Sequence, residues 1–259
     1  MADGIRLSLA TMRAVFPNAP DAIVRAFVER QGVLSAVGLN HSRQRLAYCF
    51  ANLHAETNGF TIRGLTENIN YTAARIAQVW PNRFATAFAV QARYGTAPGW
   101  QAKAFDDLYG NRMGNRPGTS DGSRYIGRGG PQITGRDGYA EIGKRVGVAL
   151  EANPELASSP GLQPDIAAAF WDWKGMNRFA DAGDFIGCVK AWNGGTNGLA
   201  ERQAQLARIL PILQKAEWGE VIAAPAKPPP DRISVSTAAS RPSAWAAFFM
   251  AIVKLFGRA

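Results

Sequence analysis

The chain reads His54-Ala-Glu56-Thr-Asn-Gly-Phe-Thr-Ile-Arg-Gly-Leu-Thr-Glu67-Asn-Ile-Asn-Tyr71, and these residues are the most informative in the sequence. Glu56 stands at the end of an apolar helical pattern. Glu67 stands in a polar, glycine-containing stretch just beyond it. Hydrolysis of a glycosidic bond requires two carboxyl groups in unlike environments, one protonated and one ionised. The segment therefore predicts a helix followed by a loop that together supply a catalytic pair.

The two glutamates are expected to differ in pKa. Glu56 lies on the closing turn of its helix, where the negative end of the dipole and apolar neighbours disfavour a carboxylate and raise the pKa. A general acid needs that property. Glu67 is followed by Asn68 and Asn70, whose side chains form hydrogen bonds, so we expect it to stay ionised. The structural alternatives are a solvated helix-end glutamate and a turn residue ahead of the Thr72 helix.

A second segment, residues 125–139 (YIGRGGPQITGRDGY), is rich in glycine. Three glycines within four residues permit close approach of the backbone to a ligand. Arg128, Gln132, Thr134 and Tyr139 supply donors and a stacking surface of the kind that a sugar chain requires. A phosphate-binding loop is excluded, because no Gly-Lys-Ser/Thr is present. The alternative is a glycine-rich turn without a ligand.

A third segment, Trp192-Asn193-Gly-Gly-Thr-Asn-Gly198, opens a helix that carries Arg202. Asn193 is suited to hold a water molecule or a sugar amide. Arg202, if it faces the same site, would hold a carboxylate in its ionised form. A turn followed by a surface arginine explains this segment equally well.

Helical spacing of apolar residues dominates the chain and predicts a mainly α fold. One helix is expected to begin at Asp21 and to reach as far as Leu34, and another is expected to begin at Ser42. Further helices are expected over 72–79, 83–93, 100–110, 137–146, 164–174, 184–192 and 198–216. A small hairpin is expected from 123–126 and 132–134. We expect a catalytic domain over 1–220, a Pro/Ala/Ser-rich linker over 221–242 and a cationic apolar tail helix over 243–259.

Composition and charge narrow the class of protein. The 259 residues carry a formal net charge of +9, which favours a polyanionic partner without choosing one. Cys49 falls within an apolar helical pattern and is expected to be a buried free thiol, with one disulfide to Cys188 as the alternative. The two histidines form no cluster with metal-ligand spacing, so we expect neither a metal site nor a cofactor. The N-terminal residues do not form a signal peptide, which predicts accumulation in the cytoplasm of the producing cell.

Taken together, the motifs resemble the catalytic domain of glycoside hydrolase family 19, the family of chitinases and phage endolysins. The resemblance spans roughly residues 10–215 and rests on several motifs that follow one another in the order typical of the family. They are residues 54–56 with a following Gly-Phe, 67–71, 109–115 (YGNRMGN), 127–134 and 192–195. The plant enzymes' disulfide cysteines are missing, so the bacterial and phage branch is the nearer likeness. One departure is Gly138, where the family usually has Asn before the tyrosine.

The resemblance implies a lysozyme-like helical domain with a substrate cleft and an inverting mechanism. By analogy Glu56 is the general acid, Glu67 is the base, and Thr134 helps to position the attacking water. An inverting site has its carboxyl groups about 6.5–9.5 Å apart. The predicted substrate contacts are Gln132, Tyr139, Trp192, Asn193, Arg202 and Arg128.

We expect an endolysin that cleaves peptidoglycan after release from the cytoplasm and works as a monomer without a nucleic-acid partner. The alternatives are a chitinase, a lytic transglycosylase, or a catalytically inactive protein that binds cell wall or membrane. The apolar run in 244–256 would cover about 20 Å as a helix, which is short of a span of roughly 30 Å. It is therefore expected to lie on an anionic membrane, or else to dock on protein.

Overall fold

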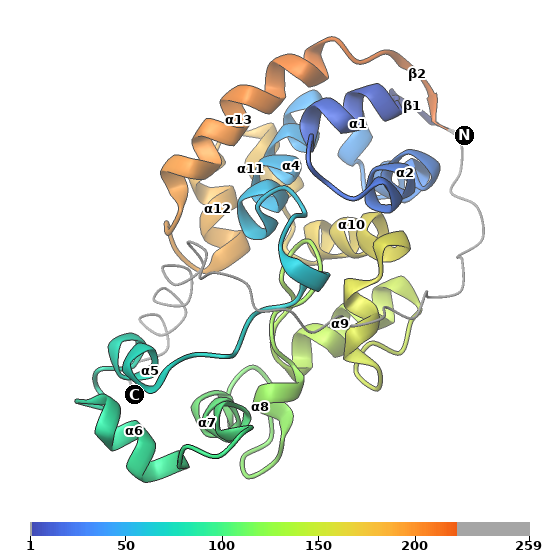
Figure 1. The fold of residues 1–259 in the computed structure, drawn as a ribbon. Helices are drawn as coiled ribbons and strands as arrows, with labels where there is room; N and C mark the ends of the chain where they lie inside the picture. The colour runs from blue at the N-terminus through green and yellow to red at the C-terminus, as the bar shows by residue number, and fades with distance from the viewer. Residues whose placement is uncertain (1, 222–259) are drawn as a thin grey trace.

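The computed structural model describes residues 2–221, which form a mainly helical fold with one pair of short strands (Figure 1). The helices are α1 (Leu9–Val15), α2 (Asp21–Glu29), α3 (Gln31–Ala36), α4 (Arg43–Thr57), α5 (Ala73–Val79), α6 (Ala87–Tyr94), α7 (Trp100–Tyr109), α8 (Asp121–Arg124), α9 (Arg136–Val146), α10 (Gln163–Trp173), α11 (Asn177–Asp181), α12 (Phe185–Asn193) and α13 (Leu199–Gln214). Short 3-10 helices are η1 (Leu39–His41), η2 (Arg63–Leu65), η3 (Pro154–Ser158) and η4 (Pro160–Leu162), and the strands are β1 (Ala2–Ile5) and β2 (Trp218–Val221).

The part of the chain after residue 221 bears the predicted linker and tail helix, and both lie outside the described residues. Val221, expected to begin the linker, instead ends β2. No helix within residues 2–221 is both long enough and apolar enough to cross a membrane.

Hydroxyl and carboxylate caps set several helix starts where the sequence predicts them. The Ser42 hydroxyl accepts hydrogen bonds from the N–H groups of Gln44 and Arg45, and Thr72 and Asp184 cap α5 and α12 in the same way. The predicted helix from Asp21 through Leu34 is instead divided at Arg30 into α2 and α3. There the buried Arg30 guanidinium makes two hydrogen bonds with the carboxylate of Asp165, of 2.6 and 2.7 Å.

The strands are not those expected from the sequence. Ser123 lies in α8, and in place of a hairpin Arg128 and Ile133 exchange two backbone hydrogen bonds as an isolated bridge. The sheet is formed by β1 and β2, paired antiparallel with Ala2 opposite Val221 and Ile5 opposite Trp218. Each strand has four residues and contains a glycine, so neither gives a recognisable strand pattern.

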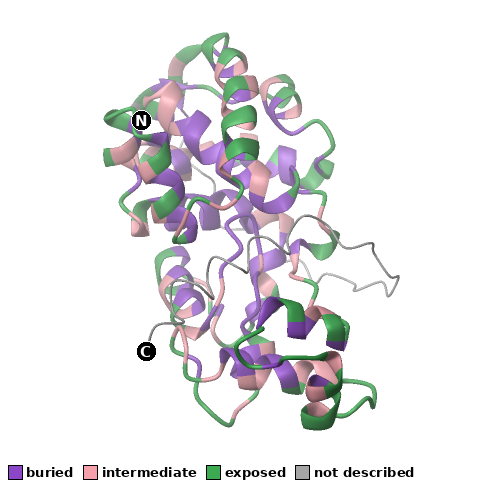
Figure 2. Cartoon of the chain, turned by 90° about the vertical axis from the view of Figure 1, so that its left-hand side faces the viewer, coloured by how far each residue is buried: buried purple, intermediate pink, exposed green. Residues whose placement is uncertain are grey.

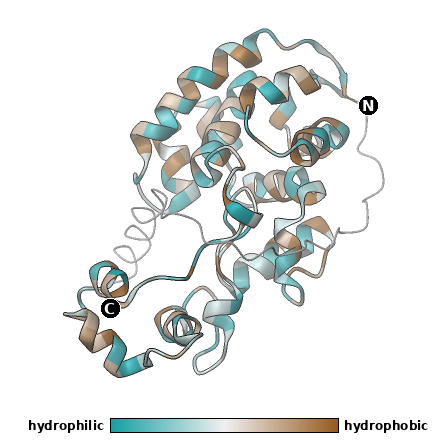
Figure 3. Cartoon of the chain, in the orientation of Figure 1, coloured by the Kyte–Doolittle hydropathy of each residue, from teal (hydrophilic) through white to brown (hydrophobic). Residues whose placement is uncertain are grey.

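Two hydrophobic cores divide the molecule into lobes. The larger lobe buries side chains of α1–α4 and α9–α13, and the smaller lobe buries side chains of α5–α7 with Ile126. Phe16, Phe50 and Phe60 pack edge to face in the larger core, with ring centroids 5.0–5.5 Å apart. Figure 3 shows hydrophilic and hydrophobic residues alternating along the helices, as expected where one side of a helix packs into a core.

Two crossing segments, residues 58–72 and 110–135, connect the lobes, and they pair with each other. The Glu67 N–H donates to the Gly127 carbonyl at 2.8 Å, and the Gly129 N–H donates to the Leu65 carbonyl at 2.9 Å. Thr66 and Arg128 form an antiparallel bridge between these bonds. Buried backbone continues from the larger lobe into this region (Figure 2). Glu67 is thus fixed where the chain passes between two separately packed lobes.

Candidate active site

Glu56 lies in the last turn of α4 and is only 1% exposed. Its Oε1 accepts a hydrogen bond from Nη2 of Arg202 at 2.5 Å, and Nη1 of the same guanidinium donates to Oδ1 of Asn52 at 2.7 Å. The second carboxylate oxygen, Oε2, is buried and has no hydrogen-bond partner within residues 2–221. One oxygen of Glu56 is therefore anchored, and the other is left for a ligand.

Burial raises the pKa of Glu56 above its ordinary value, and the neighbouring Arg202 works against that rise. The direction agrees with the sequence prediction, although the main cause is burial. Arg202 is 2% exposed and pairs with Glu56, as expected for an arginine that faces this site, and its burial leaves no face for the substrate contact that was also predicted. Asn52 was missed, although its position one helical turn before Glu56 places it on the same face of α4.

Glu67 belongs to the first crossing segment and is held by the second. Its Oε2 accepts a hydrogen bond from the Gly127 N–H at 3.0 Å. Its Oε1 is buried and has no hydrogen-bond partner in the described part of the chain. The two glutamates thus share one arrangement, with one oxygen anchored and one unpaired, but their anchors differ.

The prediction that Glu67 stays ionised is wrong for neutral pH. Burial raises the pKa of Glu67 to about 8, against the lowering effects of the Gly127 N–H and of Arg128. The side chain of Asn68, expected to support the charge, instead accepts a hydrogen bond from the Asn70 N–H. The polar neighbours in sequence therefore leave the Glu67 carboxyl group in a poorly solvated position.

Three tyrosines, of which Tyr109 and Tyr139 are buried and Tyr71 is half-buried, lie within electrostatic reach of Glu67. Burial, together with the charge of Glu67, raises the pKa of Tyr71 to about 12 and also raises the pKa of Tyr109 well above its ordinary value. The pKa of Tyr139 is also raised, mainly by burial. Tyr71 and Tyr109 belong to the smaller lobe, which therefore borders the Glu67 side of the site. Both belong to the motifs at 67–71 and 109–115, but no catalytic or binding role was predicted for either of them from the sequence.

The glycines of residues 127–130 make room for the protein's own groups. A Cβ atom on Gly127 would lie 2.7 Å from Oε1 of Gln132, and one on Gly130 would lie 2.8 Å from Cδ2 of Leu53. Leu53 stands one turn before Glu56 on α4, whereas Gly127 contacts Glu67. The glycine-rich segment therefore packs against the elements that carry both carboxyl groups, and close approach to a ligand is not needed to explain it.

The other predicted contacts in this segment are largely internal. The Gln132 side chain is buried and donates to the Gly129 carbonyl at 2.8 Å, and the half-buried Thr134 hydroxyl donates to the Gln132 carbonyl at 3.0 Å. Nη1 of Arg128 donates to the hydroxyl of Tyr139 at 2.9 Å. Tyr139 is fully buried, so it cannot provide the stacking surface that we expected.

The third segment organises the start of α13. Asn193 accepts a hydrogen bond from the Gly195 N–H at 3.0 Å and donates to the Asn197 carbonyl at 3.2 Å. Trp192 is buried against Phe170, with ring centroids 4.8 Å apart, and so it does not offer a face to a sugar. The segment therefore positions the helix that brings Arg202 to Glu56.

The backbone between the two glutamates is strained at three residues. Asn58, Phe60 and Leu65 have φ values of 49°, 66° and 45°, in the left-handed region that residues other than glycine rarely adopt. The Thr57 hydroxyl helps to hold this path by accepting the Phe60 N–H at 2.8 Å. Such strain persists where the surroundings fix it and is common at functional sites.

Cys49 is free and buried, as predicted, and Cys188 is likewise free and buried. Within residues 2–221, no group of three or more His, Cys, Asp or Glu residues is placed to hold a metal ion.

No protein-family model matches the chain. A Haemophilus influenzae protein described as a glycosyl hydrolase family 19 domain-containing protein is 30% identical over 200 residues, covering 76% of this chain and 92% of that protein. Chitinase C from Streptomyces griseus superposes with a TM-score of 0.51 at 19% identity, over 82% of this chain and 94% of that one. A bacterial family 19 chitinase superposes with a TM-score of 0.50 at 16% identity, over 84% and 98% of the two chains. These likenesses confirm the predicted lysozyme-like, mainly helical fold.

Proposed function

Because this chain belongs to glycoside hydrolase family 19 and is a glycoside hydrolase, we propose that it cleaves the β-1,4 bonds between N-acetylated amino sugars of peptidoglycan. The observation that carries the proposal is a pair of glutamates, Glu56 buried and Glu67 half-buried, each with one anchored oxygen and one buried oxygen that has no partner within residues 2–221. Buried carboxyl oxygens without partners are unfavourable for folding, so their presence favours a catalytic role.

In the proposed inverting reaction, Glu56 donates a proton to the leaving glycosidic oxygen, and Glu67 accepts a proton from the attacking water. Arg202 stabilises the carboxylate that Glu56 becomes, because its guanidinium already lies 2.5 Å from Oε1. Oε1 of Glu67 faces the water while Oε2 stays on the Gly127 N–H. The half-buried Thr134 helps to position that water, while Gln132 and Asn193, whose side chains make hydrogen bonds within the protein, hold the loops of the site in place.

Peptidoglycan is favoured over chitin by charge. The chain carries +9 overall, and peptidoglycan with its carboxylates is a polyanion, whereas chitin is neutral. Chitinase activity is the second candidate, supported by the names of the solved chitinases that share the fold.

The proposed setting is lysis of a bacterial host. The enzyme would act as a monomer on the cell wall after release from the cytoplasm, and its tail, residues 243–259, would bind anionic lipid through aromatic and basic side chains. Truncation after Ala224 should then reduce sedimentation with anionic liposomes and leave hydrolysis of soluble substrate unchanged. Equal sedimentation would contradict membrane binding.

The proposed activity is tested by digesting purified peptidoglycan and chitin oligomers and identifying the products by mass spectrometry. Hydrated reducing ends from peptidoglycan support the proposal. Anhydro ends would indicate a lytic transglycosylase, cleavage of chitin alone would indicate a chitinase, and no product from either would indicate an inactive binding protein. Glu56→Gln should reduce turnover by about 10²–10⁴-fold, the usual contribution of a general acid, while the exposed Glu29→Gln serves as the control.

A further inference from the structure

A second site is suggested by a cavity of about 660 Å³ that neither catalytic glutamate lines. It lies along α8, α9 and the loop formed by residues 147–152. Its charged lining residues are Arg116, Asp121, Arg124, Arg136, Lys144 and Glu151. The volume falls within the range of about 300–1,000 Å³ that is usual for small-ligand sites.

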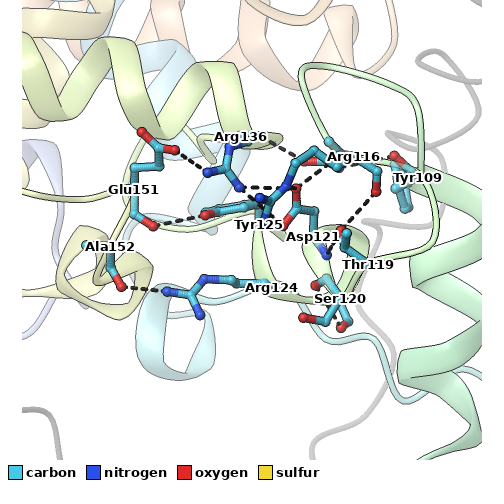
Figure 4. Close-up of polar contacts among 12 residues, drawn as sticks. Tyr109, Arg116, Thr119, Ser120, Asp121, Arg124, Tyr125, Arg136, Glu151 and Ala152 are labelled. Atoms are coloured by element: carbon cyan, nitrogen blue, oxygen red, sulfur yellow. Dashed lines mark hydrogen bonds and ion pairs between the residues drawn. The ribbon is translucent and has the colours of Figure 1, made fainter.

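The two acidic side chains of the cavity are already paired. Asp121 accepts hydrogen bonds from Nε of Arg116 at 3.0 Å and from Nη1 of Arg136 at 3.2 Å, as Figure 4 shows. The hydrogen bond from Arg116 contributes most to holding the pKa of Asp121 well below its usual range. Glu151 lies 2.6 Å from Nη2 of Arg136. Two carboxylates are therefore balanced by two guanidinium groups.

Arg124 and Lys144 are left with uncompensated charge. No carboxylate within residues 2–221 forms an ion pair with either of them, so the six charged groups sum to +2 (four positive and two negative). Nη2 of Arg124 donates to the Ala152 carbonyl at 2.6 Å, which holds the guanidinium at the cavity wall (Figure 4). Both side chains are exposed and can therefore meet a ligand from solution.

The cavity adjoins the catalytic region through shared residues. Tyr139 lines the cavity, and its hydroxyl accepts a hydrogen bond from Arg128, whose charge acts on Glu67. Nη1 of Arg128 also donates to the backbone carbonyl of Arg124 at 2.7 Å. These hydrogen bonds of Arg128 thus link the wall of the basic cavity to the side of the site where Glu67 lies.

We propose that this cavity binds a carboxylate group of the peptide branches that peptidoglycan carries, with Arg124 and Lys144 as its cationic contacts. The inference rests on the proposed function and specifies its substrate further. Chitin has no such branch, so the cavity would favour peptidoglycan through binding rather than through the chemical step. Pairing of an ionised carboxylate with an arginine is strong enough to give this discrimination.

The test measures binding separately from cleavage. Calorimetry compares a soluble muropeptide that has free branch carboxylates with the same muropeptide after amidation. Wild-type protein should bind the acidic form about tenfold more tightly, a difference of 1.4 kcal/mol. Arg124→Gln/Lys144→Gln should abolish that preference. The control Arg25→Gln/Lys215→Gln changes net charge equally at two exposed positions outside the cavity lining and should retain it.

Kinetics provide the second readout. The Arg124/Lys144 double variant should raise KM for peptidoglycan with kcat unchanged, and should leave turnover of chitin oligomers at the wild-type value. Equal binding of acidic and amidated muropeptides by the wild type would overturn the inference even if peptidoglycan is cleaved. Charge-dependent binding by a wild type that cleaves no peptidoglycan would instead leave the inference standing and remove the proposed function.

Discussion

At Glu67, burial opposes the charge that a general base requires. With a pKa of about 8, roughly a tenth of the Glu67 carboxyl groups are ionised at pH 7. If Glu67 is the base, the part of the pH profile in which kcat/KM rises should follow the ionisation of Glu67, with its midpoint near pH 8, and any fall at higher pH follows loss of the Glu56 proton. Initial rates on a soluble oligomer between pH 5 and 10 measure this limb. A rise centred near the ordinary glutamate pKa of 4.5, or no rise between pH 5 and 10, would contradict the proposed role of Glu67.

The same carboxyl group should lower the stability of the fold at alkaline pH. Its pKa is raised in the folded protein, so folding favours the neutral form. Stability is therefore highest below the unfolded pKa of about 4.5 and declines as pH rises towards 8. Glu67→Gln removes this effect and should stabilise the protein relative to the wild type at pH 9, with little change at pH 4.

Thermal unfolding of wild type and Glu67→Gln at both pH values checks this prediction, with Glu29→Gln as the exposed control. An equal effect of Glu67→Gln at pH 4 and pH 9 would mean that the ionisation of Glu67 does not govern the difference.

Among the elements, the paired crossing segments control the geometry of Glu67. Gly127→Ala would place a Cβ atom 2.7 Å from Oε1 of Gln132 and 3.5 Å from Oε2 of Glu67. We expect kcat/KM to fall by about 10²-fold, because small displacements of a catalytic group have effects of that size. Gly138→Ala is the matched control, since its Cβ would meet only Cγ2 of Ile133, at 3.1 Å. Similar activities for the two variants would argue against the role given to this pairing.

The sequence predicts most helices well, because capping residues and apolar periodicity are local signals. Ser42, Thr72 and Asp184 each cap a helix where the pattern places one. The division at Arg30 depends on Asp165, which lies 135 residues away, and no local pattern contains that partner. The β1–β2 sheet likewise depends on pairing between the two ends of residues 2–221.

The residues of the candidate site could be predicted from the sequence, but the burial and hydrogen-bond partners of their side chains could be predicted only in part. Motif order identified Glu56 and Glu67, but the burial of Glu67 depends on its pairing with Gly127, sixty positions later. From the sequence, Tyr139 and Trp192 were predicted to be aromatic side chains that contact the sugar. Both side chains are instead buried in the hydrophobic core, because a large aromatic ring can stabilise a core as well as a binding surface.

For the whole molecule, β1 ties the start of the described chain to its end. Ile5 is fully buried at the end of β1, whereas Leu9, at the start of α1, is 44% exposed. Ile5→Ala should lower the free energy of unfolding by about 2–5 kcal/mol, the usual cost of a large core truncation. Leu9→Ala should change it by less than about 0.5 kcal/mol. Denaturant unfolding of both variants tests the prediction, and comparable losses would contradict it.

The site joins parts of the molecule that fold around separate cores. Glu56 and Arg202 belong to the larger lobe, Tyr71 and Tyr109 to the smaller lobe, and Glu67 to the segment between them. The relative placement of the two carboxyl groups therefore depends on how α4 and the crossing segments are held together, with Gly130 against Leu53 as one contact.

The pairing of Ala2 with Val221 also makes the catalytic domain a suitable scaffold for circular permutation. Because the two residues lie opposite each other in neighbouring strands, a short glycine-rich linker can join them without crossing the molecule. New ends opened at the exposed residues 95–99, between α6 and α7, would lie on the smaller lobe. A binding module fused there would be carried by the lobe that borders Glu67, rather than by the strand pair of the larger lobe.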